Sequence, residues 1–170
     1  MWPTAPVLDA LAALPRPAVD GVRWSTQDQW HVTLRFFGEL GPVDVERARA
    51  ALALVAGSWP GPFEVLGGPG TRFLGPSLVV WPVEGLASLA RAVEQATAGI
   101  GRPVPDRRFV GHLTIARGHR GTDLRRLPHL LQALATSWSV SSLSLVESLL
   151  SPAGARYRDV DAFPVGPARD

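Results

Sequence analysis

The chain contains the stretch Gln29-Trp30-His31-Val32-Thr33-Leu34-Arg35-Phe36-Phe37-Gly38 and a second version of it in Arg108-Phe109-Val110-Gly111-His112-Leu113-Thr114-Ile115-Ala116-Arg117-Gly118. Both stretches contain His, an apolar residue, Thr and an apolar residue in that order. Alternation of polar and apolar residues with a period of two is typical of a half-buried β-strand. We therefore expect two strands, one presenting His31 with Thr33 on a single face and the other presenting His112 with Thr114.

Imidazole and hydroxyl groups paired in this way suit proton transfer at a phosphate. If the two strands face each other across a cleft, they supply two proton-transfer groups and two hydrogen-bond donors. Imidazole has an unperturbed pKa near 6.5, so it can accept or donate a proton near neutral pH. Hydroxyl donors can stabilise the charge that builds on phosphate oxygens in a transition state. One His-x-Thr triplet arises easily by chance, whereas two copies with similar flanks are a far more specific signal.

The doubled motif resembles the 2H phosphoesterase superfamily, and within it the bacterial RNA 2′,3′-cyclic phosphodiesterases, also called 2′-5′ RNA ligases. The segment from Trp30 to Glu39 is similar to the first motif of that family, and the segment from Phe109 to Arg117 is similar to the second. Ala155-Arg156-Tyr157 lies where the family has a similar Arg-Tyr before its last strand. The resemblance covers most of the chain.

This resemblance implies that RNA 2′,3′-cyclic phosphate ends are hydrolysed to 2′-phosphates without a metal or another cofactor. It assigns the general acid that protonates the departing ribose oxygen to His31, and the base that activates water to His112. The residues alone allow these two roles to be exchanged. Thr33 and Thr114 would donate hydrogen bonds to the non-bridging oxygens. The expected partner is an RNA with a 2′,3′-cyclic phosphate end or a small nucleotide.

Three further residues are candidates for substrate binding. Arg117 matches a family arginine that helps hold the phosphate, but strict alternation places it on the face opposite His112, so this role requires a strand end or a bulge. Arg35 has the same parity as His31, and it either lines the cleft or is a solvated strand residue. Tyr157 either stacks on a base or packs half-buried against its neighbours.

Length and composition indicate one domain, residues 1–170, with a core of its own. There is no Cys, which excludes disulfides and thiolate metal sites and makes a reducing cytoplasm the default compartment. No apolar run reaches the length of a membrane span, and no secretory signal is evident. The formal charge of +2 does not by itself indicate a nucleic-acid-binding protein. We expect a monomer.

Periodicity and turn residues predict the elements. Helical spacing of apolar residues predicts helices within the ranges 7–14, 43–56, 86–98 and 124–134. Strands are predicted at the two motif stretches and in the ranges 21–24, 63–66, 77–83, 138–150 and 157–165, the last two joined by a turn over 151–154. The glycine-rich range 67–72 is interpreted as a turn, because it lacks the Lys and Ser/Thr of a phosphate-binding loop.

This order of elements fits an α+β domain with antiparallel sheets. The resemblance makes the fold more specific, because it implies two pseudo-symmetric lobes, two antiparallel sheets with flanking helices, and a central cleft. Members of that family begin with a strand ahead of the first helix, whereas this chain begins with Met1-Trp2-Pro3. The first strand is therefore expected to be missing, which would leave an unpaired sheet edge in one lobe.

Several alternative functions remain open from the sequence. A reversible 2′-5′ RNA ligase or a phosphodiesterase for small cyclic nucleotides would use the same motifs, and a non-catalytic protein could bind RNA ends with the same cleft. A zinc site formed by His112, His119 and His129 is conceivable, but the spacing matches no familiar ligand pattern. His119 and His129 are otherwise interpreted as structural residues. The basic residues are dispersed along the chain, so the sequence does not distinguish an RNA end from a small nucleotide.

Overall fold

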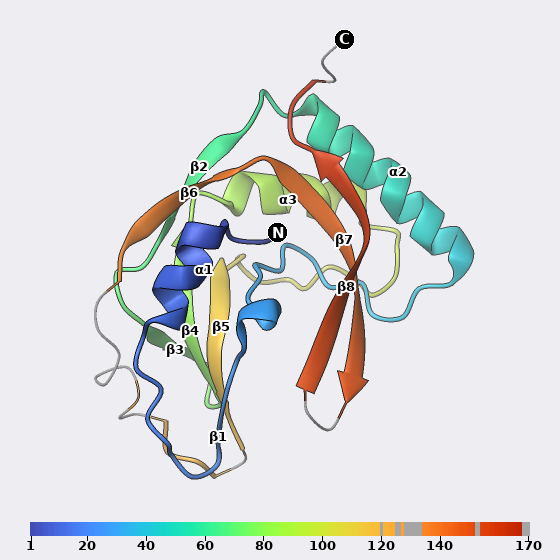
Figure 1. Cartoon of the computed structure of the whole chain (residues 1–170). Helices are drawn as coiled ribbons and strands as arrows, with labels where there is room; N and C mark the ends of the chain where they lie inside the picture. Colours follow the sequence, from blue (N-terminus) through green and yellow to red (C-terminus); the bar gives the residue numbers. More distant parts are fainter. Residues whose placement is uncertain (120, 125–126, 128–133, 152–153, 168–170) are drawn as a thin grey trace.

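The computed structural model describes residues 1–119, 121–124, 127, 134–151 and 154–167 (Figure 1). Its helices are α1 (Ala5–Ala12), α2 (Pro42–Ser58), α3 (Ala87–Ala96) and the short 3-10 helix η1 (Gln27–Gln29). Proline stands in the first turn of α1 and of α2, where its missing N–H costs no helical hydrogen bond. The predicted helices in the ranges 7–14, 43–56 and 86–98 are thus confirmed, with shifted ends.

One antiparallel sheet holds six strands in the order β1-β5-β4-β2-β6, and β3 pairs with β4 beside that path. Its strands are β1 (Val22–Trp24), β2 (Phe63–Gly67), β3 (Arg72–Leu74), β4 (Leu78–Glu84), β5 (His112–Gly118) and β6 (Thr136–Val140). A separate antiparallel hairpin is formed by β7 (Ser142–Ser151) and β8 (Gly154–Pro164). In Figure 1 this hairpin curves across the molecule in front of the sheet. The expected α+β class with two antiparallel sheets is confirmed.

The core lies on the sheet beneath the helices. Trp81 on β4 is fully buried and its ring stacks with that of Trp138 on β6, with the centroids 6.0 Å apart. Gly67 on the neighbouring β2 allows this packing, because a Cβ there would lie only 1.9 Å from the Trp81 ring. Helix α3 buries Leu89 and Val93 in the same core cluster.

The first motif stretch is not a β-strand, and this part of the prediction is wrong. Residues 30–41 follow η1 as irregular chain. Side chains still alternate at its start, since Trp30 and Val32 are buried while Thr33 is exposed. The alternation is a local property of extended backbone, whereas a strand also requires a ladder. Here the backbone partner is Met1, which accepts a hydrogen bond from the Val32 N–H (2.9 Å) and donates its ammonium to the Val32 carbonyl (3.2 Å).

Other predicted elements also differ from the structure. The single strand predicted over 138–150 is divided at Ser141 into β6 and β7, which belong to different sheets. Strand β4 is shifted by one residue from the predicted range 77–83, and the short β3 was not predicted. Most of the helix predicted over 124–134, and residues 152–153 of the turn, lie outside the described residues.

The two sheets are unequal in size. Within the part of the chain that the structure describes, one has six strands and the other has two, so the pseudo-symmetry of two lobes stays a prediction. No strand precedes α1 in residues 1–4, all of which the structure describes. Among the described residues, none of the helices is long and apolar enough to cross a membrane.

Candidate active site

A large cleft of about 1850 Å³ lies between β5 and the β7–β8 hairpin. Its lining includes both motif histidines and both motif threonines: His31, Thr33, His112 and Thr114. These residues come from the irregular first-motif segment and from β5, which are 81 residues apart in the chain, since 112 − 31 = 81. The structure therefore brings together the four residues that the repeated motif singled out.

The two histidines are held by the same local hydrogen bond. Nδ1 of His31 donates to the carbonyl of Gln29 at 2.8 Å, and Nδ1 of His112 donates to the carbonyl of Val110 at 2.8 Å. In each case the acceptor lies two residues earlier. Because a carbonyl oxygen can only accept, Nδ1 must carry the proton. The neutral form of each ring therefore has its lone pair on Nε2, the nitrogen left for proton transfer.

Of the two histidine rings, that of His31 is the more enclosed, because aromatic side chains pack around it. Its centroid lies 4.3 Å from that of Tyr157 and 5.5 Å from that of Trp2. Burial lowers the pKa of His31 below its ordinary value of 6.5. The hydrogen bond to Gln29 opposes this shift, while the nearby positive charges of the Met1 ammonium, Arg117 and His112 add to it. His31 is thus biased toward the neutral form in the unliganded protein.

A β-bulge brings Arg117 to the cleft. On the β4–β5 ladder Val79 pairs with Ala116 but Val80 pairs with Thr114, so Ile115 is the extra residue. Ile115 and Ala116 are buried in succession, which breaks the alternation. Of the two possibilities that the sequence left for Arg117, a strand end or a bulge, the structure has the bulge, and Arg117 lines the same cleft as His112.

One of the two sequence-based alternatives for Arg35, that it lines the cleft, agrees with the structure, and the residue has a second role as well. It borders the cleft, but its Nη2 donates to three backbone carbonyls at and beyond the end of α3, those of Thr97 (3.2 Å), Ile100 (2.9 Å) and Arg102 (2.8 Å). Arg35 is half-buried and does not lie on a strand, so the interpretation as a solvated strand residue is wrong. Through these hydrogen bonds Arg35 connects the first-motif segment to the segment that follows α3.

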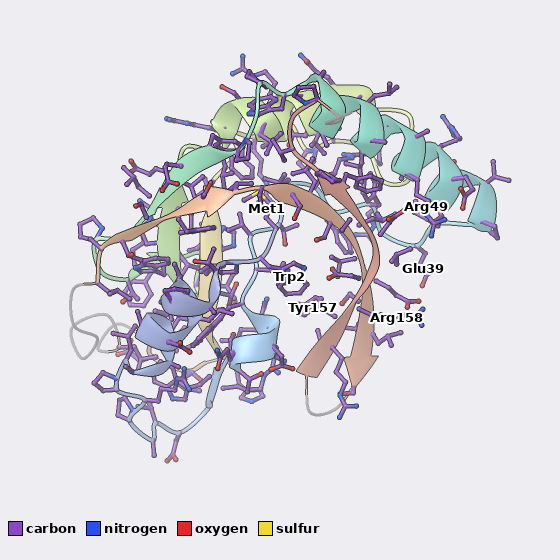
Figure 2. All side chains as sticks on the ribbon, turned by 45° about the horizontal axis from the view of Figure 1, so that its top comes forward. Met1, Trp2, Glu39, Arg49, Tyr157 and Arg158 are labelled. Carbon is purple, nitrogen blue, oxygen red and sulfur yellow. The ribbon has the colours of Figure 1, made fainter. Side chains whose placement is uncertain are left out.

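Tyr157 lies on β8 and lines the cleft beside His31. Figure 2 shows Tyr157 together with Met1 and Trp2 in the space between the sheet and the hairpin, while Arg49 lies on the outer side. The rings of Trp2 and Tyr157 are 6.4 Å apart, and Trp2 Nε1 donates to Asp159 on β8 at 2.9 Å. Tyr157 therefore packs against the histidine ring and still reaches the cleft.

Comparison with known proteins shows the family of this chain. A family model described as the 2′-5′ RNA ligase superfamily matches residues 6–151. The chain belongs to this superfamily. An RNA 2′,3′-cyclic phosphodiesterase of Methanothermobacter thermautotrophicus is 32% identical over 156 residues, which cover 84% of this chain and 82% of that protein.

Solved structures of similar fold extend the comparison. TT0787 of Thermus thermophilus superposes with a TM-score of 0.81 at 23% identity, over 96% of this chain and 94% of that one. LigT of E. coli, in a crystal structure with 3′-AMP, superposes with a TM-score of 0.69 at 19% identity, over 86% and 82% of the two chains. At these identities the likeness shows a shared fold.

Two residues of the site were not assigned by sequence reasoning. Gln29 accepts from the Thr26 N–H through Oε1 (3.2 Å) and donates to the Ala155 carbonyl on β8 through Nε2 (2.9 Å). The Thr26-x-x-Gln29 spacing is that of a helical capping box, a signal that could have identified it. Arg23 on β1 lines the cleft opposite Arg117 in the β1–β5 register, and only the pairing of those strands reveals it.

The zinc alternative gains no support. Within the part of the chain that the structure describes, there is no group of three His, Cys, Asp or Glu residues that could hold a metal ion. His119 is exposed near the end of β5, and His129 lies outside the described residues.

Proposed function

We propose that this member of the 2′-5′ RNA ligase superfamily hydrolyses the 2′,3′-cyclic phosphate ends of RNA to 2′-phosphates by metal-independent acid–base catalysis. The observation that carries the proposal is the pair of imidazoles in one cleft, each fixed by an Nδ1–H hydrogen bond that leaves Nε2 for proton transfer. Further support comes from the relative at 32% identity that is named an RNA 2′,3′-cyclic phosphodiesterase.

The reaction needs one proton acceptor and one proton donor on opposite sides of the phosphorus. His112 takes a proton from water as the water oxygen attacks phosphorus. The bond from phosphorus to the ribose O3′ breaks, and protonated His31 gives its proton to that oxygen. The products are a 2′-phosphate and a free 3′-hydroxyl. Positioned acid–base groups of this kind typically contribute about 10²–10⁴-fold in rate.

The lowered pKa of His31 bears on this assignment. A general acid must be protonated, whereas burial favours the neutral form of His31 in the unliganded protein. A bound phosphate anion opposes that effect, because an opposite charge nearby stabilises the imidazolium. We therefore expect the substrate itself to bring His31 into its protonated form. The exchanged assignment, with His31 as base, would suit the unliganded protein better.

Hydroxyl and guanidinium groups complete the proposed site. Thr33 and Thr114 would donate hydrogen bonds to the non-bridging phosphate oxygens, and Arg117 would balance their charge. All three residues line the cleft that holds the histidines. Tyr157 would hold the His31 ring in place from the side of β8.

The decisive experiment incubates the purified chain with a short RNA ending in a 2′,3′-cyclic phosphate in the presence of EDTA and separates 2′-phosphate from 3′-phosphate products. We expect the 2′-phosphate, and its loss in the His112→Ala variant. A 3′-phosphate product would reverse the identity of the leaving oxygen. Activity that disappears with EDTA would contradict metal independence, and tight binding without turnover would favour the non-catalytic alternative.

A further inference from the structure

A second cavity of about 400 Å³ adjoins the catalytic cleft. The two cavities share His112, Thr33, Arg35, Phe36 and Arg102 in their linings. A volume of this size lies within the usual range for small-molecule sites. A nucleotide joined to the one that reacts between the histidines could therefore reach the second cavity without leaving the protein surface.

Arginines gather around this cavity, and three of the four come from the short range 102–108. Besides Arg35, which holds the end of α3, its lining contains Arg102, Arg107 and Arg108, against Glu94 as the carboxylate. Arg107 and Arg108 are exposed, and neither has an ion-pair partner among the described residues. Asp106 lies next to them in the chain but does not line the cavity. The cavity is thus markedly more positive than the whole chain, whose formal charge is +2.

An exposed aromatic ring also lines the second cavity. Phe36 is 62% exposed, and the Arg102 guanidinium lies 5.6 Å from its ring centroid. Basic groups that follow a phosphodiester backbone, combined with an aromatic ring on which a base can stack, are the usual means of binding single-stranded RNA.

We infer that this second cavity binds the nucleotide on the 5′ side of the reacting one, with Arg107 and Arg108 contacting its phosphate and Phe36 stacking on its base. The inference rests on the proposed function and narrows it, because it makes an oligonucleotide end a better substrate than a cyclic mononucleotide. A terminal base in this cavity would explain the aromatic ring but not the arginines, since a base carries no charge.

The test compares two substrates that share a terminal nucleoside, a 2′,3′-cyclic mononucleotide and a trinucleotide ending in a 2′,3′-cyclic phosphate. In the Arg107→Gln/Arg108→Gln variant the ratio of the trinucleotide kcat/KM to the mononucleotide kcat/KM should fall about tenfold, as expected for lost charged hydrogen bonds. The salt dependence of the trinucleotide should weaken by about 0.7 in log–log slope for each phosphate contact removed. Phe36→Leu should lower the same ratio about fivefold or more.

The matched control is Arg72→Gln/Arg91→Gln, which removes the same charge from exposed residues outside both cavities. An unchanged ratio in the Arg107/Arg108 variant, or an equal fall in the control, overturns the inference. Binding of a trinucleotide that already ends in a 2′-phosphate, followed by fluorescence anisotropy, should weaken in the same variant and not in the control. This second measurement needs no turnover. It therefore distinguishes the case in which the proposed reaction does not occur from the case in which the second cavity does not bind a nucleotide.

Discussion

The two His-x-Thr stretches share the pattern His, apolar, Thr, apolar but are held in place very differently. His112 and Thr114 lie on β5, which is hydrogen-bonded to β1 on one side and to β4 on the other. His31 and Thr33 lie on irregular chain outside both sheets. Both rings nevertheless make the same Nδ1–H bond to the carbonyl two residues earlier. The orientation of the imidazole therefore depends on local extended backbone and not on membership of a sheet.

Isolated hydrogen bonds hold the first stretch in place, whereas the sheet holds the second. Gln29 ties its start to β8, Arg35 ties its end to the carbonyls beyond α3, and Met1 pairs with Val32 between them. Each of these contacts is made by a single residue, whereas β5 is held by two ladders. The first stretch should therefore be the more sensitive of the two to single substitutions that do not touch a histidine.

The largest expected effects follow from removing either imidazole. His31→Ala and His112→Ala should each lower kcat on a cyclic-phosphate RNA end by at least about 10²-fold, because each removes a proton-transfer group. Far-ultraviolet circular dichroism and the urea midpoint should show that both variants still fold. Near-normal turnover in either variant would show that its histidine is not a proton-transfer group, and the two stretches would then not have equivalent roles.

A smaller effect, on stability, should appear at Arg35. Arg35→Met keeps most of the aliphatic volume but leaves the partly buried carbonyl of Ile100 without this donor. Loss of such a donor costs about 1–3 kcal/mol in the free energy of unfolding, measurable by urea denaturation. Arg91→Met, at an exposed position on α3, is the control and should stay within about 0.5 kcal/mol of the parent. Equal free energies of unfolding in the two variants would show that the hydrogen bonds of Arg35 do not stabilise the fold.

The smallest effect is a pH dependence carried by the enclosed ring. Because burial lowers the pKa of His31 below 6.5, the unfolded chain binds a proton there more readily than the folded protein. The stabilising contribution is fully present above pH 6.5 and is lost as the pH falls through the lowered pKa of the folded state. Urea denaturation at pH 7.5 and pH 5.5, values chosen to bracket the ordinary pKa, should show a smaller loss of stability in His31→Gln than in the parent protein.

Two points make that comparison specific. Burial also lowers the pKa of the Met1 ammonium from 8.0 to about 6. The free energy of unfolding therefore decreases as the pH falls through that range, in the parent and in the variant alike. The difference between the two proteins therefore reports His31. The exposed His119 provides the control, since His119→Gln should follow the parent. An identical loss in parent and His31→Gln would contradict the assigned burial effect.

Sequence reasoning succeeded where the decisive pattern is local. Apolar spacing located α2 and α3, and the alternation around His112 identified β5. The parity of Arg117 predicted either a strand end or a bulge near it, and the β4–β5 ladder contains the bulge. These features depend on residues close together in the chain.

It failed where the answer depends on a distant partner. The stretch around His31 has the alternation of a strand, but no strand of the described residues pairs with it. The break at Ser141 divides a run of strand-forming residues between two sheets, and no single residue in that run predicts the break. The role of Arg35 is set by carbonyls more than sixty positions away in the chain, beyond the reach of motif or period.

The central claim is that two differently supported imidazoles act as one catalytic unit. The most direct test is single-turnover kinetics of His31→Ala, His112→Ala and the double variant on one RNA with a 2′,3′-cyclic phosphate end. Groups that act as a unit are strongly non-additive, so the double variant should be about as slow as the slower single variant. A double variant slowed by the product of the two single effects would mean that the histidines contribute independently and would contradict the account.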